Sequence, residues 1–144
     1  MTYRIREVDP EDDDIADHIR ELHLLTFADS AKIPDGIDSM AWWFAYLDKT
    51  PVAFAGLQRS THEINAGYFN RVGVLHAHRG QNLGKRLMRA LEAYAFREGY
   101  DKIISDCSPD NFPSANNFIA SGYFMFQPKW PWSFDNQLYW VKAL

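Results

Sequence analysis

The sequence has a single cysteine and no long apolar run. Cys107 cannot form a disulfide within the chain, so the protein is not a disulfide-stabilised scaffold. No stretch approaches the ~20 consecutive apolar residues that cross a bilayer. The first residues also lack the apolar core of a signal peptide. These absences indicate a reducing, cytoplasmic setting and no membrane partner.

Positive charge is also scarce. The chain carries 15 Lys and Arg against 19 Asp and Glu, which gives a formal net charge of -4. A broad basic surface for nucleic acid is therefore not expected. Hydrophobic residues make up 47% and charged residues 24%, values that are typical of a globular protein rather than a disordered chain. Because 144 residues suffice for one well-formed core, we expect a single domain over residues 1–144.

Hydrophobic periodicity predicts a mixed α/β chain whose first half is largely antiparallel. The clearest helix runs over 83–98, because apolar residues recur at i,i+4 spacing from Leu83 to Ala95. It stands between strands over 67–75 and 102–106, an order that makes a parallel pair through a right-handed crossover. The other predicted elements are strands over 3–8, 41–47, 52–58, 123–126 and 136–142 and helices over 12–27 and 114–121.

Caps, turns and glycines refine these boundaries. Any of the three carboxylates at 12–14 can cap the first helix by accepting hydrogen bonds from its first N–H groups. Residues 48–51 are predicted to form a hairpin turn, whereas 28–39 is irregular or carries a short helical turn. Gly73 interrupts a strand, which indicates either a bulge or the close approach of another backbone or a ligand.

The junction between the strand over 67–75 and the helix over 83–98 has the features of a phosphate-binding loop. Gly80 and Gly84 allow a tight turn with unobstructed N–H groups, and the helix N-terminus adds partial positive charge. An ordinary strand-to-helix turn is the alternative. A Walker loop is excluded because Lys85 is followed by Arg86 rather than Ser or Thr. The dinucleotide fingerprint is excluded because the order of elements and the glycine spacing both differ.

Two motifs resemble a known family. Val72-x-Val74, four further residues and Arg79-Gly80-x-x-Leu83-Gly84 before an amphipathic helix resemble the acyl-CoA-binding signature of the GNAT superfamily of N-acyltransferases. Downstream, Asn111 and Phe118, with Gly122-Tyr123 eleven positions after the asparagine, resemble the second pattern of that family. The resemblance implies a GNAT-like α/β (α+β) fold. In that fold a mixed, mostly antiparallel twisted sheet has a central parallel pair that splays, and helices flank the sheet.

The resemblance also implies where acetyl-CoA binds. Backbone groups at Val72 and Val74 would pair with the pantetheine arm, and the N–H groups from Gly80 to Lys85 would hold the pyrophosphate. Asn82 replaces the usual glycine of the loop, and asparagine is the non-glycine residue best able to adopt positive φ. The coenzyme-binding residues implied in this way are Val72, Gly73, Val74, Arg79, Gly80, Gln81, Asn82, Leu83, Gly84, Lys85, Asn111 and Phe118.

The catalytic groups are less well defined. Phe118 stands where many relatives carry a tyrosine that protonates the departing thiolate, and phenylalanine has no proton to donate. Another acid or water must then serve. The resemblance places an oxyanion donor at the backbone N–H of Val72 or Gly73.

Two residues upstream are candidates for the proton route. Strand periodicity puts Tyr68 and Asn70 on the same face as Val72 and Val74, so we name these two as candidate catalytic residues. A solvent chain assisted by His62, Glu63 or the main chain is the alternative.

Other reactive side chains favour structural roles. Cys107 has no apparent His and Asp pairing in the sequence, which favours a buried inert thiol. His76 and His78 lack a third ligand, so no metal is expected. Trp130 and Trp132, separated by a proline, cannot both face inward. They either wall the acceptor pocket or form a subunit contact.

These observations predict an enzyme that transfers acetyl from acetyl-CoA to a primary amine by direct attack in a ternary complex. A small-molecule acceptor is favoured, and Asp29, Asp35 and Asp38 would attract a cationic one or serve only to solubilise the chain. A peptide or protein amine is the main enzymatic alternative. The absence of a tyrosine at Phe118 also leaves open a non-catalytic acyl-CoA sensor. A module that works only through a partner surface is the third alternative, and a homodimer is left open.

Overall fold

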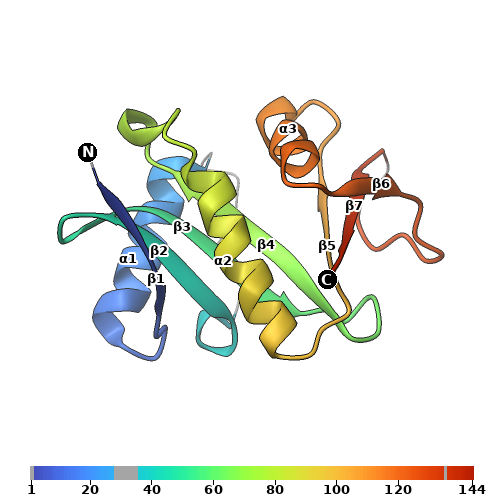
Figure 1. The fold of residues 1–144 in the computed structure, drawn as a ribbon, viewed down its shortest axis with the longest axis horizontal. Helices are drawn as coiled ribbons and strands as arrows, with labels where there is room; N and C mark the ends of the chain where they lie inside the picture. The colour runs from blue at the N-terminus through green and yellow to red at the C-terminus, as the bar shows by residue number, and fades with distance from the viewer. Residues whose placement is uncertain (1, 28–35, 135) are drawn as a thin grey trace. The chain divides into compact units, whose positions relative to one another are not determined.

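The computed structural model describes residues 2–27, 36–134 and 136–144. Its strands form a mixed sheet in the order β1-β2-β3-β4-β5-β7-β6 (Figure 1). In chain order the elements are β1 (Tyr3–Val8), α1 (Asp13–Thr26), η1 (Ile37–Ser39), β2 (Ala41–Leu47), β3 (Thr50–Arg59), β4 (Ala66–Val74), η2 (His76–His78), α2 (Leu83–Arg97), β5 (Lys102–Cys107), α3 (Phe112–Ala120), β6 (Phe124–Phe126) and β7 (Leu138–Ala143), where η denotes a 3₁₀ turn.

The chain divides into two compact units. The first unit comprises Met1–Gln58 and Asn70–Leu91, and the second unit comprises Arg59–Phe69 and Glu92–Leu144. Strand β4 and helix α2 each contribute residues to both units. The units are therefore described one at a time.

In the first unit, α1 packs on an antiparallel ladder of β1, β2 and β3. The ladder pairs Tyr3 with Leu47 and Trp42 with Gly56. Asp12 caps α1, because its side chain accepts hydrogen bonds from the first-turn amides. The core cluster of this unit is Ile19, Leu22, Ile37, Met40, Trp42, Phe44 and Phe54.

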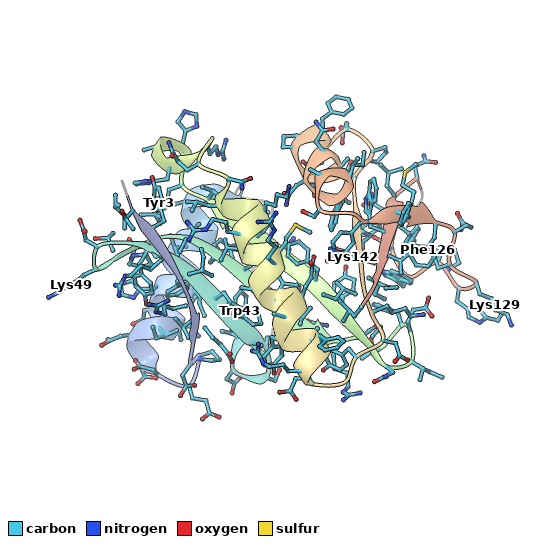
Figure 2. All side chains as sticks on the ribbon, in the orientation of Figure 1. Tyr3, Trp43, Lys49, Phe126, Lys129 and Lys142 are labelled. Atoms are coloured by element: carbon cyan, nitrogen blue, oxygen red, sulfur yellow. The ribbon has the colours of Figure 1, made fainter. Side chains whose placement is uncertain are left out.

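In the second unit, β7 lies between β5 and β6 and pairs antiparallel with both. The first residues of β4 pair parallel with β5, from Ala66 opposite Lys102 to Tyr68 opposite Ile104. Lys142, labelled in Figure 2, extends from β7 and donates to Glu92 Oε1 at 2.9 Å. This ion pair ties the strand to the last part of α2.

The predicted fold class is confirmed: the sheet is mostly antiparallel, contains a parallel pair and is flanked by helices. The predicted turn over 48–51 is too long, because Leu47 pairs with Thr50 and strand β3 already starts there. Asp48 adopts φ 54, which a two-residue hairpin loop requires. The divergence of β4 and β5 beyond their three paired residues stays a prediction.

Other boundaries shift for local reasons. Helix α3 begins at Phe112 rather than 114, because the side chain of Asn111 caps it and Pro113 fits the first turn. Of the segment predicted to be irregular, only 36–39 is described; it forms the short turn η1 after Gly36, whose φ is 70. Within the described ranges, no helix is long and apolar enough to cross a membrane.

Candidate coenzyme and acceptor sites

The predicted phosphate loop lies in the first unit, between β4 and α2. Gly80 and Asn82 adopt φ 78 and φ 62, so both are left-handed, and the expectation that Asn82 takes positive φ is confirmed. The carbonyl of Asn82 accepts from the N–H of Arg86 at 3.1 Å, which makes Asn82 the residue that opens the helix. Two left-handed residues thus turn the chain into the N-terminus of α2.

This loop is open to solvent and offers hydrogen-bond donors. The residues from Arg79 to Asn82 are exposed, and a Cβ built on Gly80 meets nothing within 4 Å. The N–H groups in the first turn of a helix have no partner within the helix, and the helix dipole adds positive charge there. For α2 these groups belong to Leu83, Gly84 and Lys85. The arrangement can therefore bind an anion.

Side chains of the first unit hold the loop in place. Arg79 Nε donates to Val74 O at 3.3 Å, which keeps the guanidinium beside the end of β4. The hydroxyl of Tyr3 and His78 Nδ1 share a hydrogen bond of 3.0 Å, and Arg86 donates to Tyr3 O at 3.2 Å. His78 therefore anchors the loop to β1. Across residues 2–27, 36–134 and 136–144, no cluster of His, Cys, Asp and Glu has the makings of a metal site.

Gly73 is required by packing inside the first unit. A Cβ at this position would lie 2.5 Å from both Phe54 Cε1 and Thr26 Oγ1. The groups that approach this glycine are therefore side chains of β3 and α1, whereas the sequence predicted a bulge or the approach of a backbone or a ligand. A bound ligand is not needed to explain the residue.

The same contacts show that β4 does not alternate regularly. Asn70 Nδ2 donates to Gln58 Oε1 at 2.8 Å and lies 4.0 Å from Met40 Sδ, in the layer of α1. Gly73 also faces this layer, although residues three apart in a regular strand face opposite sides. This irregularity between Asn70 and Gly73 is typical of a β-bulge. That Asn70 shares a face with Val72 and Val74 stays a prediction.

The other candidate, Tyr68, belongs to a polar cluster in the second unit. Its hydroxyl donates a hydrogen bond to Asp106 Oδ2, and Trp132 Nε1 donates to the same oxygen at 2.9 Å. His62 stacks on Trp132 with the rings 4.9 Å apart and 6° from parallel. We call Tyr68, Asp106, Trp132 and His62 the Asp106 cluster. Asp106 is not among the residues predicted from the sequence, although it is a carboxylate in a strand of otherwise mostly buried residues.

The residues of the second GNAT pattern have structural partners. Asn111 accepts from the N–H of Ser114 at 3.3 Å, as the cap of α3. Phe118 is 2% exposed and stacks on Trp140 with the rings 5.3 Å apart. The hydroxyl of Tyr123 donates to Glu92 Oε2 at 3.0 Å. Burial, with the negative charge of Glu92, raises the pKa of Tyr123, so this phenol keeps its proton.

The remaining candidates are separated by the structure. Cys107 is buried, and its sulfur accepts from Trp140 Nε1 at 3.3 Å, in agreement with a structural thiol. Trp130 is 77% exposed, whereas Trp132 is half-buried in the Asp106 cluster. Glu63 pairs with Lys102 at 3.7 Å. Of the two tryptophans, Trp132 is therefore the one held in the same cluster as the candidate catalytic residue Tyr68.

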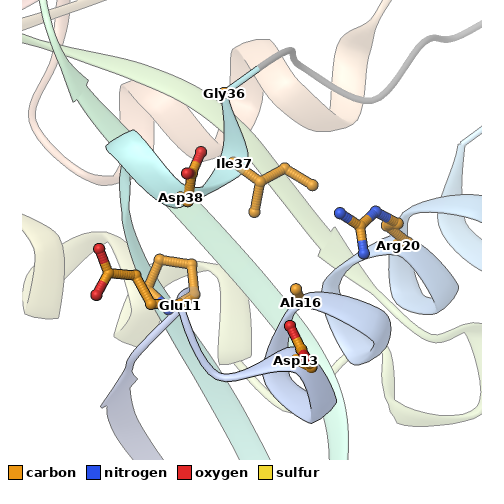
Figure 3. A pocket seen from close by; sticks show the side chains of 8 residues that line it. Glu11, Asp13, Ala16, Arg20, Gly36, Ile37 and Asp38 are labelled. Atoms are coloured by element: carbon orange, nitrogen blue, oxygen red, sulfur yellow. The ribbon is translucent and has the colours of Figure 1, made fainter.

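A pocket of about 550 Å³ lies in the first unit between the start of α1 and η1 (Figure 3). Arg20 is the positively charged residue among those that line it. Its Nη1 lies 3.3 Å from Asp17 Oδ1. None of the predicted coenzyme-binding or catalytic residues lines this pocket. Of the three acidic residues expected to attract a cationic acceptor, Asp38 lines this pocket, and the other two, Asp29 and Asp35, lie outside the described residues. The lining residues are Pro10, Glu11, Asp13, Ala16, Arg20, Gly36, Ile37 and Asp38.

The order of the strands and the loop that opens α2 are those of the acyl-CoA N-acyltransferase fold. The chain belongs to the acetyltransferase (GNAT) family, whose model matches residues 3–123. The resemblance found in the two sequence motifs is thereby confirmed. No curated protein is significantly similar to the chain in sequence.

Solved structures share the fold at low sequence identity. An IAA acetyltransferase from Bacillus cereus is 13% identical with a TM-score of 0.78, covering 99% of this chain and 100% of its own. The PaiA N-acetyltransferase from Thermoplasma acidophilum, in complex with coenzyme A, is 15% identical with a TM-score of 0.74 and full coverage, 100%, of both chains. A ribosomal-protein-alanine N-acetyltransferase from Escherichia coli is 12% identical with a TM-score of 0.74, covering 99% and 94%. These similarities extend along nearly the whole chain.

Proposed function

We propose that this protein transfers the acetyl group of acetyl-CoA to a primary amine of a small molecule, by direct attack in a ternary complex. The observation that carries the proposal is the loop over 79–82, where two left-handed residues lead into the N-terminus of α2. The structure of the PaiA N-acetyltransferase with coenzyme A supports the choice of carrier. The proposal includes a single domain over 1–144 and a cytoplasmic setting.

The coenzyme residues divide into two roles. The N–H groups from Gly80 to Lys85 would hold the pyrophosphate, since a helix N-terminus favours anions. Arg79 adds positive charge at the opening of the loop. Backbone groups of Val72 and Val74 would pair with the pantetheine arm, as an added strand pairs with a sheet edge.

The chemistry follows from this placement. The lone pair of the neutral amine attacks the thioester carbonyl carbon, and the N–H of Val72 or Gly73 would stabilise the oxyanion. The C–S bond then breaks, and the thiolate takes a proton. Phe118 has no proton to donate. The hydroxyl of Tyr123 keeps its proton and donates a hydrogen bond to Glu92. We therefore assign water as the donor of the proton that the thiolate takes. The proposal assigns no metal.

The side chains of the two candidate catalytic residues have different hydrogen-bond partners. The amide of Asn70 donates to Gln58 within the first unit, which favours a structural role. Tyr68 donates to Asp106, a carboxylate that can accept a proton passed through the phenol. Tyr68 is therefore the favoured residue on the proton route from the amine.

Calorimetry with CoA tests the loop. In the Gly84→Glu variant, a carboxylate stands in the first turn of α2, and we expect CoA affinity to fall by roughly 100-fold or more. Arg79→Ala should weaken binding by about tenfold, the loss of one charge-assisted contact. Ala93→Glu adds the same charge on an exposed position of α2 and should leave affinity within about twofold. An unchanged affinity in Gly84→Glu would remove the proposal.

A further inference from the structure

The predicted phosphate loop has little packing of its own to fix its shape. Residues 79–82 are exposed, and a Cβ built on Gly80 meets nothing within 4 Å. Ordering each residue of such a loop costs conformational entropy. The loop therefore depends on the residues at its two ends for the shape in which its N–H groups can bind an anion.

Tyr3 contacts the residues at both ends of this loop. Its hydroxyl shares the 3.0 Å hydrogen bond with His78 Nδ1, and the two rings meet edge-on with centroids 5.8 Å apart. Its backbone carbonyl accepts from Arg86 Nη2 at 3.2 Å. His78 directly precedes Arg79, and Arg86 directly follows Lys85. One residue thus holds both ends of the segment that would bind the pyrophosphate.

Tyr3 itself has a fixed position in the first unit. It is 7% exposed and pairs with Leu47 in the ladder of β1 and β2. Figure 2 labels it at the start of β1. It is 75 positions from His78 and 83 positions from Arg86. The sheet, rather than the local chain, therefore sets where the two ends of the loop lie.

We propose that Tyr3 is a positioning residue of the coenzyme site, which holds the phosphate loop in its anion-binding shape before CoA arrives. This inference rests on the proposed function and adds a residue that neither sequence motif contains. Tyr3 acts through His78 and Arg86, so its role requires no contact with CoA. A preformed loop binds its ligand more tightly, because less ordering accompanies binding.

The alternative is that Tyr3 only stabilises the first unit as a whole. A buried aromatic ring contributes to the core in which it packs, and its hydroxyl would then matter for unfolding without a particular effect on the loop. The two roles differ in where the protein opens when the hydroxyl is removed. Lost anchoring opens the loop alone, whereas lost core stability increases opening throughout the unit.

Trypsin distinguishes these roles without CoA. The loop begins with Arg79, and the hairpin between β2 and β3 carries Lys49, which is exposed like Arg79 and belongs to the same unit. Tyr3→Phe keeps the ring and removes the hydroxyl. We expect cleavage after Arg79, followed by mass spectrometry, to become about three- to tenfold faster, as the loss of one hydrogen bond predicts. Cleavage after Lys49 should stay within about twofold. Equal acceleration at both sites, or none after Arg79, would overturn the inference.

Calorimetry with CoA measures the effect on coenzyme binding. Tyr3→Phe should weaken CoA binding by about three- to tenfold. The KM for acetyl-CoA should rise to the same extent while kcat stays within about twofold, because the hydroxyl does not act at the reacting atoms.

Tyr46→Phe is the matched control. It removes a hydroxyl from β2, where the ring of Tyr46 packs against Phe44 and has Arg4 Cζ 6.0 Å from its centroid. This change should leave CoA affinity within about twofold. Equal losses of affinity in Tyr46→Phe and Tyr3→Phe would show that the effect is not specific to the loop.

A double-mutant cycle tests the route through His78. In a His78→Ala background the partner of the hydroxyl is already absent, so Tyr3→Phe should change CoA affinity by less than about twofold. Fully additive losses from the two substitutions would contradict a hydroxyl that acts through His78.

The result is separable from that of the proposed function. If the unaltered protein binds CoA and acetylates amines, but Tyr3→Phe binds CoA as tightly, this inference fails and the acetyltransferase stands. If the unaltered protein does not bind CoA, the proposed function fails, whereas faster cleavage of Tyr3→Phe after Arg79 still supports Tyr3 as the anchor of the loop. Should Tyr3→Phe not fold, His78→Ala removes the same hydrogen bond from its other side and should show the same faster cleavage.

Discussion

At the scale of single residues, two different physical constraints explain the glycines and the asparagine in and after β4. Gly80 and Asn82 are set by backbone angle, because both are left-handed and a Cβ on Gly80 meets no neighbour. Gly73 is set by space, because Phe54 and Thr26 approach its Cα closely. The first kind of requirement is visible in a motif, whereas the second depends on residues distant in the sequence.

We predict that Gly73→Ala destabilises the protein by about 1–3 kcal/mol, since an added methyl overpacks a filled core. Denaturant unfolding measures the change. In a Phe54→Leu background the ring atom 2.5 Å away is removed, so the added cost of the alanine should be smaller, and a double-mutant cycle reports the coupling. Equal costs in both backgrounds would contradict the crowding explanation.

His23 shows a second residue-scale effect. This histidine in α1 is 2% exposed, and its Nε2 has no hydrogen-bond partner within the described residues. Its ring stacks on Phe27 at 4.8 Å. Burial, followed by the positive charge of Arg71, lowers the pKa of His23, so the neutral ring belongs to the core of the first unit.

At the scale of elements, helix ends follow local chemistry. The side chain of Asp12 accepts from the amides of Asp14 at 2.9 Å and Ile15 at 3.4 Å, which fixes the start of α1. The same logic places the start of α3 after Asn111. Helices α1 and α3 therefore begin where a short polar side chain satisfies amides that the helix itself leaves unpaired.

We predict that Asp12→Ala lowers the free energy of unfolding by about 1 kcal/mol, the usual cost of losing an N-cap. Asp17→Ala is the matched control, because Asp17 lies on the same helix and makes only an exposed ion pair with Arg20. Its cost should stay below about 0.5 kcal/mol. Equal effects of the two substitutions on thermal or denaturant unfolding would show that the cap contributes nothing.

At the scale of the whole molecule, a GNAT chain that carries Phe118 in the family's tyrosine position must find its proton elsewhere. The ring is buried against Trp140, so solvent does not reach it. Water as the proton donor is compatible with turnover, and a sensor without turnover is the alternative. Thiol release from acetyl-CoA distinguishes the two.

We predict thiol release from acetyl-CoA in the presence of primary alkylamines, followed with a thiol-reactive dye over a panel of small amines and peptides. The rate should require both the amine and an intact loop, so Gly84→Glu should abolish it and Ala93→Glu should not. Tight CoA binding with no release across the panel would favour the sensor. Release with peptides alone would favour a peptide or protein acceptor.

The sequence alone determined the features that depend on neighbouring residues. The helix from Leu83, the positive φ of Asn82 and the parallel order of β4 and β5 all follow from periodicity, conformational preference or chain order. Two spaced motifs then indicated the family. Local signals sufficed there, because the physical cause and the residue are close in the chain.

Only the tertiary structure decided which side chains meet. Tyr68 and Asp106 are 38 positions apart, and no pattern in either strand predicts their hydrogen bond. The contacts of Asn70 with Gln58 and Met40 likewise join residues 12 and 30 positions apart in the chain. Strand periodicity assumes a regular backbone, and packing against other elements is what breaks that regularity.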